Sequence, residues 1–267
     1  MVPVEVWRHP DEGVVSDVVA AEAPLQVAID GQPFAVIMRT PGDDEALALG
    51  FLFTEGVVRG MDDVVRISTS AAGDVVDVAC SPGRAAALAA LLADRRSVTM
   101  TSSCGLCGRT ALDSLHLDLP RCAEEWRVSA DLVGALPVRL RQAQPAFDHT
   151  GGLHAAGLFN LDGHLEASAE DVGRHNAVDK LLGRMLRAGR LPLRQSLLMV
   201  SGRSSFEIVQ KAWQGGIPLV AAVSAPSSLA VQLAEDAGMT LLGFVRDHRF
   251  NVYAHRARIF QRQGTQA

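Results

Sequence analysis

The sequence predicts an α/β protein in which a smaller α+β part precedes a larger domain with helices on both faces of a sheet. In the second half of the chain, short apolar strands alternate with amphipathic helices, a pattern typical of a parallel sheet covered on both sides. The first hundred residues instead show the order strand, strand, helix twice. Apolar residues form 48% and charged residues 21% of the 267-residue chain, which is typical of a water-soluble globular protein.

The first part, residues 1–100, is expected to hold two strand pairs, each followed by a helix. Residues 24–40 favour two strands around an Asp-Gly turn, because apolar residues alternate on both sides of the turn. The helix expected next has acidic residues in its first turn and ends near Gly56. A second strand pair over residues 63–80 precedes an alanine-rich helix over residues 84–96.

A linker over residues 101–128 is expected to join the first part to an α/β domain over residues 129–267. Ser129 is suited to cap the first helix of that domain, and Pro137 is expected to kink or shorten the helix. Residues 156–168 predict a hairpin with an Asp-Gly turn.

Three strand and helix units are expected over the rest of the domain. The expected strands are residues 196–202, 217–225, 239–246 and 249–255, and the expected helices are residues 173–189, 204–216 and 227–238. Ligands of such sheets bind beyond the carboxyl ends of the strands. Ser201 and Ser224 begin serine-rich loops there, and each loop leads into a helix N-terminus that favours phosphate. We therefore expect a phosphate site at this edge, the alternative being that the serines only cap the helices.

Composition argues against several classes of protein. The sequence has no apolar run near the roughly 20 residues that span a bilayer, and its N-terminus lacks the features of a secretory signal. A cytoplasmic protein without a membrane partner is therefore expected. The net charge of −5 argues against general nucleic-acid binding. Four cysteines do not make a disulfide scaffold, and Cys80 and Cys122 are expected to be buried or incidental thiols.

The segment MTSSCGLCGRT places Cys104 and Cys107 three residues apart, each followed by glycine. A structural zinc site needs four ligands, but the sequence has no second Cys-x-x-Cys pair and no nearby histidine pair. A zinc deaminase places His-x-Glu before Pro-Cys-x-x-Cys, whereas here His164 and Glu166 follow the cysteines. No metal site is therefore expected.

Two other uses of the cysteine pair remain open. A redox pair is typically found just after the first strand of a βαβ unit, but this pair lies between two domains. The glycines make the loop flexible, which suits a thiol that must visit two places. Arg109 and a helix start near Thr110 favour a nucleophilic thiolate, so the pair also suits the holding and release of a sulfane sulfur. Composition does not separate this use from simple redox chemistry.

Several separated blocks of the sequence are long and specific. They are CGLCG, TGGLHAAGLFN, EDVGRHNAVDKLLG, SGRSSFEIVQKA, VSAPSSLAVQLAE and GFVRDHRFNVY. Together they closely resemble the formate dehydrogenase accessory sulfurtransferase family, and the resemblance extends from about Pro24 to Tyr253.

This resemblance implies a sulfurtransferase that serves the molybdenum cofactor. In such a protein a cysteine desulfurase loads a persulfide onto the Cys-x-x-Cys loop. The protein also holds the bis(molybdopterin guanine dinucleotide) cofactor, which receives the sulfur before insertion into formate dehydrogenase. The resemblance further implies a three-layer αβα, cytidine-deaminase-like domain without the deaminase zinc, and a homodimer. A non-covalent cofactor-binding chaperone for formate dehydrogenase, without sulfur transfer, is the alternative.

Individual residues follow from the matching motifs. The persulfide cysteine of the family matches Cys104, with Cys107 as its assisting partner. The cofactor-binding stretch of the family matches one loop, which comprises Phe244, Val245, Arg246, Asp247, His248 and Arg249. A glycine often occurs within that loop in the family, whereas Asp247 and His248 stand in this sequence.

Pyrophosphate and guanine groups need anion donors and planar recognition, and arginine supplies both. We therefore expect Arg246 and Arg249 to bind the cofactor, with weaker candidates in Arg256, Arg258 and Arg262.

Two residue pairs with helical spacing complete the candidates. His175 and Asp179 share a helix face and, with His154 beside a glycine pair, are expected to line the cofactor cavity. The alternative for the His175 and Asp179 pair is a structural hydrogen bond. Glu207 and Lys211 predict a surface ion pair.

Overall fold

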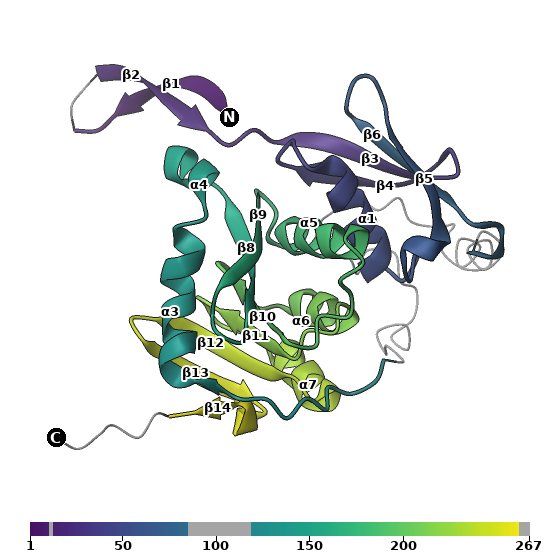
Figure 1. Ribbon diagram of the computed structural model, residues 1–267. Helices are drawn as coiled ribbons and strands as arrows, with labels where there is room; N and C mark the ends of the chain where they lie inside the picture. The colour runs from purple at the N-terminus through teal and green to yellow at the C-terminus, as the bar shows by residue number, and fades with distance from the viewer. Residues whose placement is uncertain (11–12, 85–118, 262–267) are drawn as a thin grey trace.

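The computed structural model describes residues 1–10, 13–84 and 119–261 (Figure 1). Three expectations therefore lie outside the described residues: the cysteine pair Cys104 and Cys107, the alanine-rich helix over residues 84–96, and most of the linker. Only Arg84 of that helix and the end of the linker are described. None of the helices in the described ranges has the length and apolar character needed for a transmembrane span.

The larger sheet has six strands in the order β13-β12-β11-β10-β8-β9. The strands are β8 (His154–Asn160), β9 (Leu165–Asp171), β10 (Ser196–Val200), β11 (Leu219–Ala222), β12 (Thr240–Arg246) and β13 (Arg249–Ala254). The central strands β10, β11 and β12 are parallel, as expected. The outer pairings are antiparallel: β8 runs against β10, and tight turns join β8 to β9 and β12 to β13.

Helices cover both faces of this sheet (Figure 1). They are α3 (Ala130–Arg141) on one face, and α5 (Arg174–Arg187), α6 (Phe206–Gln214) and α7 (Ser228–Ala237) on the other. Alternate residues of β10 serve the two cores, with Leu198 packed among α5, α6 and α7, and Leu197 packed against α3. The Ser129 hydroxyl caps α3 by accepting the backbone N–H of Leu132 at 3.2 Å. The helix continues beyond Pro137 to Arg141, so the proline does not end it.

The smaller sheet has four strands in the order β4-β3-β6-β5. They are β3 (Ala23–Ile29), β4 (Gln32–Arg39), β5 (Val64–Thr69) and β6 (Val75–Cys80), with α1 (Asp44–Thr54) between the two pairs. Asp30 and Gly31 both have positive φ, at 50° and 76°, which is the turn geometry that Asp-Gly favours in a hairpin. The expected strand, strand, helix order is therefore confirmed for the described residues.

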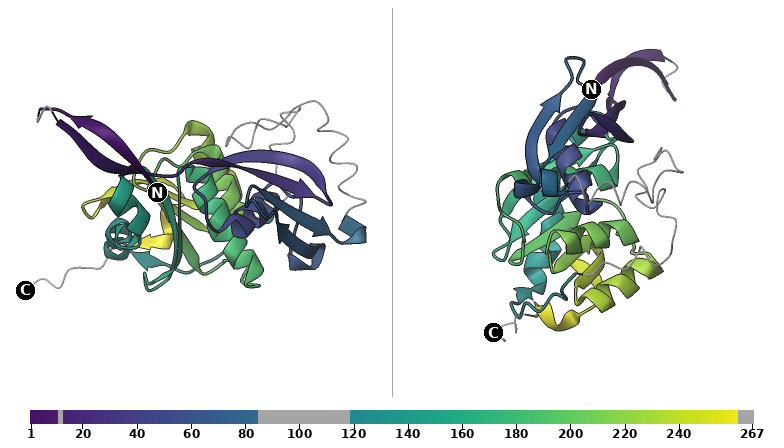
Figure 2. Two further views of the ribbon diagram at one scale, coloured as in Figure 1. Left: turned by 90° about the horizontal axis from the view of Figure 1, so that it is seen from above. Right: turned by 90° about the vertical axis from the view of Figure 1, so that its right-hand side faces the viewer.

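One hairpin was not predicted. Strands β1 (Val2–Arg8) and β2 (Gly13–Val19) pair along their whole length, and Figure 2 shows them projecting beyond the two main sheets. The loop between them has no two-residue Asp-Gly or Asn-Gly turn, the signal that marked the other hairpins. Short elements also not predicted are α4 (Pro145–Thr150), β7 (Val128–Ser129) and β14 (Ile259–Phe260).

Helix α1 of the smaller part packs directly on α5 of the larger part. Two glycines allow this close approach, because a Cβ atom at Gly50 would overlap the backbone carbonyl of Asp179. A Cβ atom at Gly183 would likewise overlap the carbonyl of Ala46. Any larger residue at either position would therefore separate the two helices.

A buried ion pair crosses the same contact. The Lys211 ammonium on α6 lies 2.8 and 2.9 Å from the two carboxylate oxygens of Asp179 on α5. It also donates to the Thr54 hydroxyl at the end of α1, at 2.8 Å. The predicted surface pair of Glu207 with Lys211 is therefore wrong, because docking of α1 covers the face of α6 that carries Lys211. The alternative for His175 and Asp179, a hydrogen bond between them, is not found either, since the Asp179 carboxylate is held by Lys211 and Thr54.

The only other lysine of the sequence spans the two parts as well. The Lys180 ammonium lies 2.8 Å from the buried Asp171 carboxylate and donates to the carbonyl of Thr40 at 2.8 Å. The backbone N–H of Thr40 in turn donates to Asp171 at 3.1 Å. Both lysines thus hold the smaller part against α5. Each ammonium group contacts one carboxylate and donates to at least one further oxygen, so neither buried charge lacks a partner.

Replacement of Gly183 by alanine tests the helix contact. We expect Gly183→Ala to lower the free energy of unfolding by about 3 kcal/mol, because the new methyl group meets backbone that cannot move aside. Denaturant unfolding followed by circular dichroism measures this. Gly60→Ala is the control, since a Cβ atom there meets nothing within 4 Å. Equal stability of the two variants would contradict the packing described for α1 and α5.

Lys211→Met tests the buried ion pair. We expect a loss of about 3–5 kcal/mol in unfolding free energy, because the buried Asp179 charge loses its partner. The double variant Lys211→Met/Asp179→Leu is expected to recover part of the loss. Arg187→Met is the control, since its pair with Glu45 is exposed and should contribute about 1 kcal/mol or less. A Lys211→Met protein as stable as the control would contradict this role.

Candidate functional site

The loops predicted to bind a ligand do meet at one edge of the larger sheet. Strands β10, β11 and β12 are parallel, so the loops that follow them, residues 201–205, 224–227 and 247–248, lie at the same edge. Backbone hydrogen bonds join them, from Ser224 N–H to the carbonyl of Gly202 at 3.4 Å and from Phe244 N–H to the carbonyl of Ser224 at 3.2 Å. We call this side of the sheet the carboxyl edge.

Strand β8 adds His154 to the carboxyl edge, because β8 runs antiparallel to β10 and begins where β10 ends. Ser201 fixes this junction, since its hydroxyl accepts the backbone N–H of Ala155 at 2.8 Å and its own N–H donates back at 3.0 Å. The structure therefore brings together Ser201, Ser224, His154 and the loop that begins at Phe244, as the sequence predicted.

The two serine-rich loops use their helix caps differently. Ser227 caps α7 by accepting the backbone N–H of Ala230 at 3.2 Å. Ser205 precedes α6 but makes no such bond, and its hydroxyl lies 3.1 Å from Nε2 of His175 instead. Ser227 therefore serves as a helix cap, as the alternative interpretation expected. Ser205 does not cap α6, because its hydroxyl lies beside the His175 ring.

His175, Ser205 and Glu207 form a cluster at the first turns of α5 and α6. Nε2 of the buried His175 lies 3.6 Å from the Glu207 carboxylate. Burial of Glu207 opposes its ionisation, but hydrogen bonds from the Ser205 hydroxyl and the backbone lower its pKa. The positive charges of His175 and Arg174 act in the same direction. Glu207 is therefore ionised, and its carboxylate accepts the Ser205 hydroxyl and lies beside His175.

His154 is held in its neutral form. Burial lowers the pKa of its imidazole, and the nearby charges of Arg174 and Arg203 lower it further, while Asp171 opposes the shift. Gly202 packs against this ring, because a Cβ atom there would lie 3.3 Å from His154 Nδ1. At neutral pH His154 thus offers one ring donor and one ring acceptor.

The loop over residues 244–249 surrounds a cavity of about 780 Å³. The cavity is lined by Phe244, Arg246, Asp247, Arg249, Phe250 and Asn251. Of the other predicted residues, Val245 points into the core below, while His248 is exposed beside Gly134 and does not line the cavity. Neither Arg246 nor Arg249 has an ion-pair partner among the described residues, so both guanidinium groups are available to an anion.

The backbone of this loop is strained. Phe244, Asp247 and His248 have φ of 54°, 49° and 58°, in the left-handed region that favours glycine. Such residues persist only where the surrounding structure holds them, and they cluster at binding sites. Asp247 and His248 thus form a left-handed turn without a glycine.

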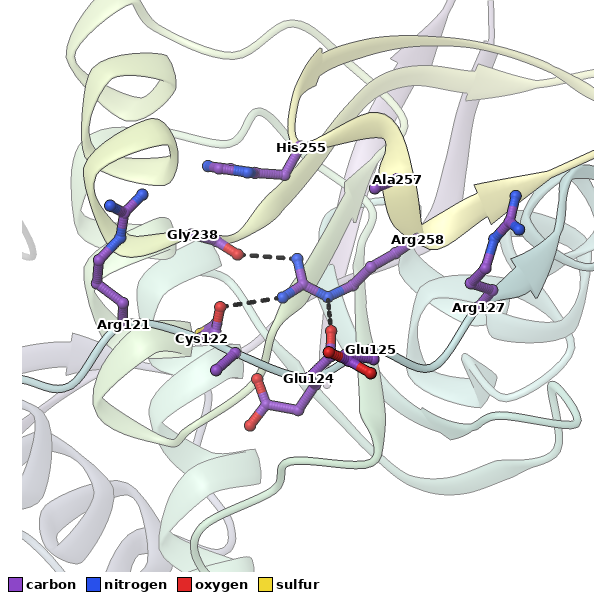
Figure 3. Close-up of a pocket in the computed structure, with 10 residues that line it drawn as sticks. Arg121, Cys122, Glu124, Glu125, Arg127, Gly238, His255, Ala257 and Arg258 are labelled. Atoms are coloured by element: carbon purple, nitrogen blue, oxygen red, sulfur yellow. Dashed lines mark hydrogen bonds between the residues drawn. The ribbon is translucent and has the colours of Figure 1, made fainter.

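A second cavity, of about 750 Å³, lies at the opposite end of β12 (Figure 3). It was not predicted. The Arg258 guanidinium there donates to the backbone carbonyls of Cys122, Glu124 and Gly238 at 3.2, 3.1 and 2.8 Å. Arg258 is thus committed to holding residues 121–127 in place, and its role as a weaker ligand candidate is not supported.

The described cysteines are poor nucleophiles. Burial raises the pKa of Cys80 to about 11, and nearby acidic residues add to the shift. Burial also raises the pKa of Cys122 to about 11, with Glu124 in the same direction. The prediction that both are buried or incidental thiols is confirmed for Cys80, which is buried, and fits the partly buried Cys122. Among the described residues, no group of three histidine, cysteine or acidic side chains could hold a metal ion.

Comparison with known proteins identifies relatives over nearly the whole chain. The model of the FdhD/NarQ family matches residues 20–260. "Sulfur carrier protein FdhD" of Streptomyces avermitilis is 49% identical, over 93% of this chain and 92% of that protein. The protein of the same name from Sulfurisphaera tokodaii is 46% identical, over 94% and 95%. A crystal structure of a putative formate dehydrogenase accessory protein from Desulfotalea psychrophila superposes with a TM-score of 0.76, at 26% identity, over 97% and 98% of the two chains.

The thiol pKa values predict selective alkylation. At pH 8 a thiol with a pKa of about 11 is about 0.1% thiolate, against roughly a quarter for an ordinary cysteine. We therefore expect iodoacetamide to modify Cys104 and Cys107 at least about a hundredfold faster than Cys80 and Cys122. Mass spectrometry of peptides from the native protein measures the four rates. Rapid alkylation of Cys80 or Cys122 would contradict the burial of these thiols.

Proposed function

The chain belongs to the FdhD/NarQ family, and from this membership we propose that it carries sulfur for a formate dehydrogenase. Cys104 accepts the sulfur, and Cys107 assists it. The observation that best supports this choice is the raised pKa of both described cysteines, which leaves the Cys-x-x-Cys pair as the nucleophilic thiols of the chain. The protein is thus a sulfurtransferase with a cysteine persulfide intermediate.

The sulfur comes from the persulfide of a cysteine desulfurase. The Cys104 thiolate attacks the terminal sulfur of that persulfide, a new S–S bond forms on Cys104, and the desulfurase cysteine leaves as a thiolate. No net oxidation occurs, because the sulfane sulfur moves between two thiolates. The Cys107 thiolate then attacks Sγ of Cys104 and breaks the S–S bond of the persulfide, so that sulfide leaves toward its acceptor, the molybdenum cofactor, and a Cys104–Cys107 disulfide holds the two electrons' worth of oxidation.

The carboxyl edge binds that acceptor, bis(molybdopterin guanine dinucleotide). Its residues fit such a ligand, because Arg246 and Arg249, which have no ion-pair partner in the described part of the chain, can each bind phosphate with two donors or stack on a guanine. Phe244 at the same cavity adds an aromatic face. The bound molybdenum centre is the sulfur acceptor, and the residues of this edge hold the phosphates and guanines of the cofactor.

The remaining expectations form part of the same proposal. Residues 1–100 support the linker of residues 101–128, which carries the cysteines, and residues 129–267 bind the cofactor in a three-layer arrangement of the cytidine-deaminase kind. The sheet with helices on both faces supports this layering. The working form is a cytoplasmic homodimer that docks on the formate dehydrogenase apoenzyme.

Sulfur loading tests the proposed carrier. With a cysteine desulfurase and ³⁵S-cysteine, the wild-type protein should gain label that thiol reagents release. Cys104→Ala should lose nearly all of it, because the attacking thiolate is absent. Cys122→Ala is the matched control and should load normally, since its thiol is protonated. Undiminished label on Cys104→Ala would remove Cys104 from this role.

The double variant Cys104→Ala/Cys107→Ala separates the carrier from a non-covalent chaperone. In cells that lack the native protein, we expect it to leave formate dehydrogenase inactive. A fully active dehydrogenase would show that binding of the cofactor suffices and that no sulfur is transferred.

A further inference from the structure

Exposed apolar side chains gather on the hairpin of β1 and β2, which we call the arm. In the described part of the chain eleven large apolar side chains are exposed, and only two of them lie outside the arm and the smaller sheet. The eleven are Met1, Val2, Trp7, Val14, Val15, Val19, Val36, Met38, Val65, Val138 and Leu229. Single exposed apolar residues are ordinary, but a cluster of them marks an interaction surface.

Both faces of the arm are apolar. Trp7 lies opposite Val14 on one face, and Val6 lies opposite Val15 on the other. Trp7 and Val14 are 60% and 68% exposed. The main contact of the arm with the rest of the described chain is with α4. Because an isolated two-stranded hairpin is only marginally stable in water, and apolar residues on both faces are typical of covered strands, the arm needs a further surface to pack on.

The smaller sheet offers an apolar surface on its outer face, which is turned away from α1. Alternate residues of β3 pack toward α1, among them Leu25 and Val27, so their neighbours face outward. Val36 and Met38 on the edge strand β4 lie opposite such neighbours and are 39% and 40% exposed. Figure 2 shows the arm pointing away from this sheet, so the arm of one chain does not cover the outer face of its own smaller sheet.

The charges of the two surfaces are complementary. Arg8 and Asp17 lie on the arm face opposite Trp7, 4.0 Å apart, so their charges offset each other. Glu5 lies on the same face as Trp7, and Arg66 on β5 lies exposed on the outer face of the smaller sheet. Neither has an ion-pair partner among the described residues. The Trp7 face of the arm therefore fits an apolar surface beside an arginine, which a second copy of this chain supplies.

Contact area favours a reciprocal arrangement. At about 3.3 Å per residue and about 4.8 Å between strands, one face of the arm has a flat area of about 220 Å². One arm and the surface beneath it would bury about 450 Å², far below the roughly 1,200 Å² of a specific interface. Two exchanged arms bury about 900 Å² of flat area, and the relief of the side chains adds to it.

We propose that two copies of this chain exchange arms, so that the Trp7 face of each arm lies on the outer face of the smaller sheet of the other copy. Glu5 of each arm then lies beside Arg66 of the partner subunit. The exchange rests on the homodimer of the proposed function and names the surfaces that join its two copies. It requires neither the cysteine pair nor a bound cofactor.

Charge reversal tests the exchange. Glu5→Arg and Arg66→Glu should each raise the dissociation constant of the dimer about tenfold, because each homodimer then has two like-charge contacts. An equimolar mixture of the two variants should recover the wild-type constant, since every arm of the mixed dimer meets the opposite charge. Sedimentation velocity over a concentration series measures the constants, and native mass spectrometry identifies the mixed dimer. A mixture no tighter than the single variants would overturn the exchange.

Trp7→Ser/Val14→Ser tests the apolar part of the same contact. The double variant should weaken the dimer at least about a hundredfold, because both arms lose the side chains that the exchange buries. Val138→Ser is the matched control, since Val138 is 60% exposed on α3 and lies outside both surfaces. Wild-type affinity in the double variant, or a monomeric wild-type protein, would overturn the exchange. Normal sulfur loading of Cys104 in a monomeric protein would show that the sulfur carrier function stands without it.

Discussion

The arrangement of the carboxyl edge depends on the buried contact of Lys211 with Asp179 and Thr54. This contact ties α6, α5 and α1 together below the site. The starts of α5 and α6 carry Arg174, His175, Ser205 and Glu207, so the ion pair joins the two helices that present those side chains. It also sets the smaller sheet against the larger one. The described residues of the smaller part end at residue 84 and those of the larger part resume at residue 119, so the same contact fixes the two points between which the sequence places the cysteines.

Charge distinguishes the two ends of the larger sheet. At the carboxyl edge Arg246 and Arg249 have no ion-pair partner among the described residues, and Arg174 has an unbonded Nε. At the opposite end the cavity has a similar volume, but the Arg258 guanidinium already donates to three backbone carbonyls. An anion therefore gains strong hydrogen bonds at the first edge and would have to displace existing ones from Arg258 at the second. Cavity volume alone would not separate the two sites.

The sequence predicted the elements of the larger sheet because their apolar period and turn residues are local signals. Convergence of Ser201, Ser224 and the 244–249 loop followed from strand order, since parallel strands end at one edge. The burial of Lys211 could not be predicted, because its spacing from Glu207 also fits a surface pair and only the docking of α1 covers it. The unpaired Arg174 Nε and the left-handed turn at Asp247 are likewise properties of the folded chain and have no local signature. The pairing of β1 with β2 lacked a short turn to signal it.

A guanine nucleotide is proposed to bind across the carboxyl edge, from His154 to Arg249. Hydrogen exchange of the full-length protein, with and without guanosine diphosphate, tests it most directly. The account predicts slower exchange of the backbone amides of residues 201–205, 224–228 and 244–249, with unchanged exchange around the cavity at Arg258. Protection confined to residues 121–127 and 255–258, or no protection anywhere, would contradict it.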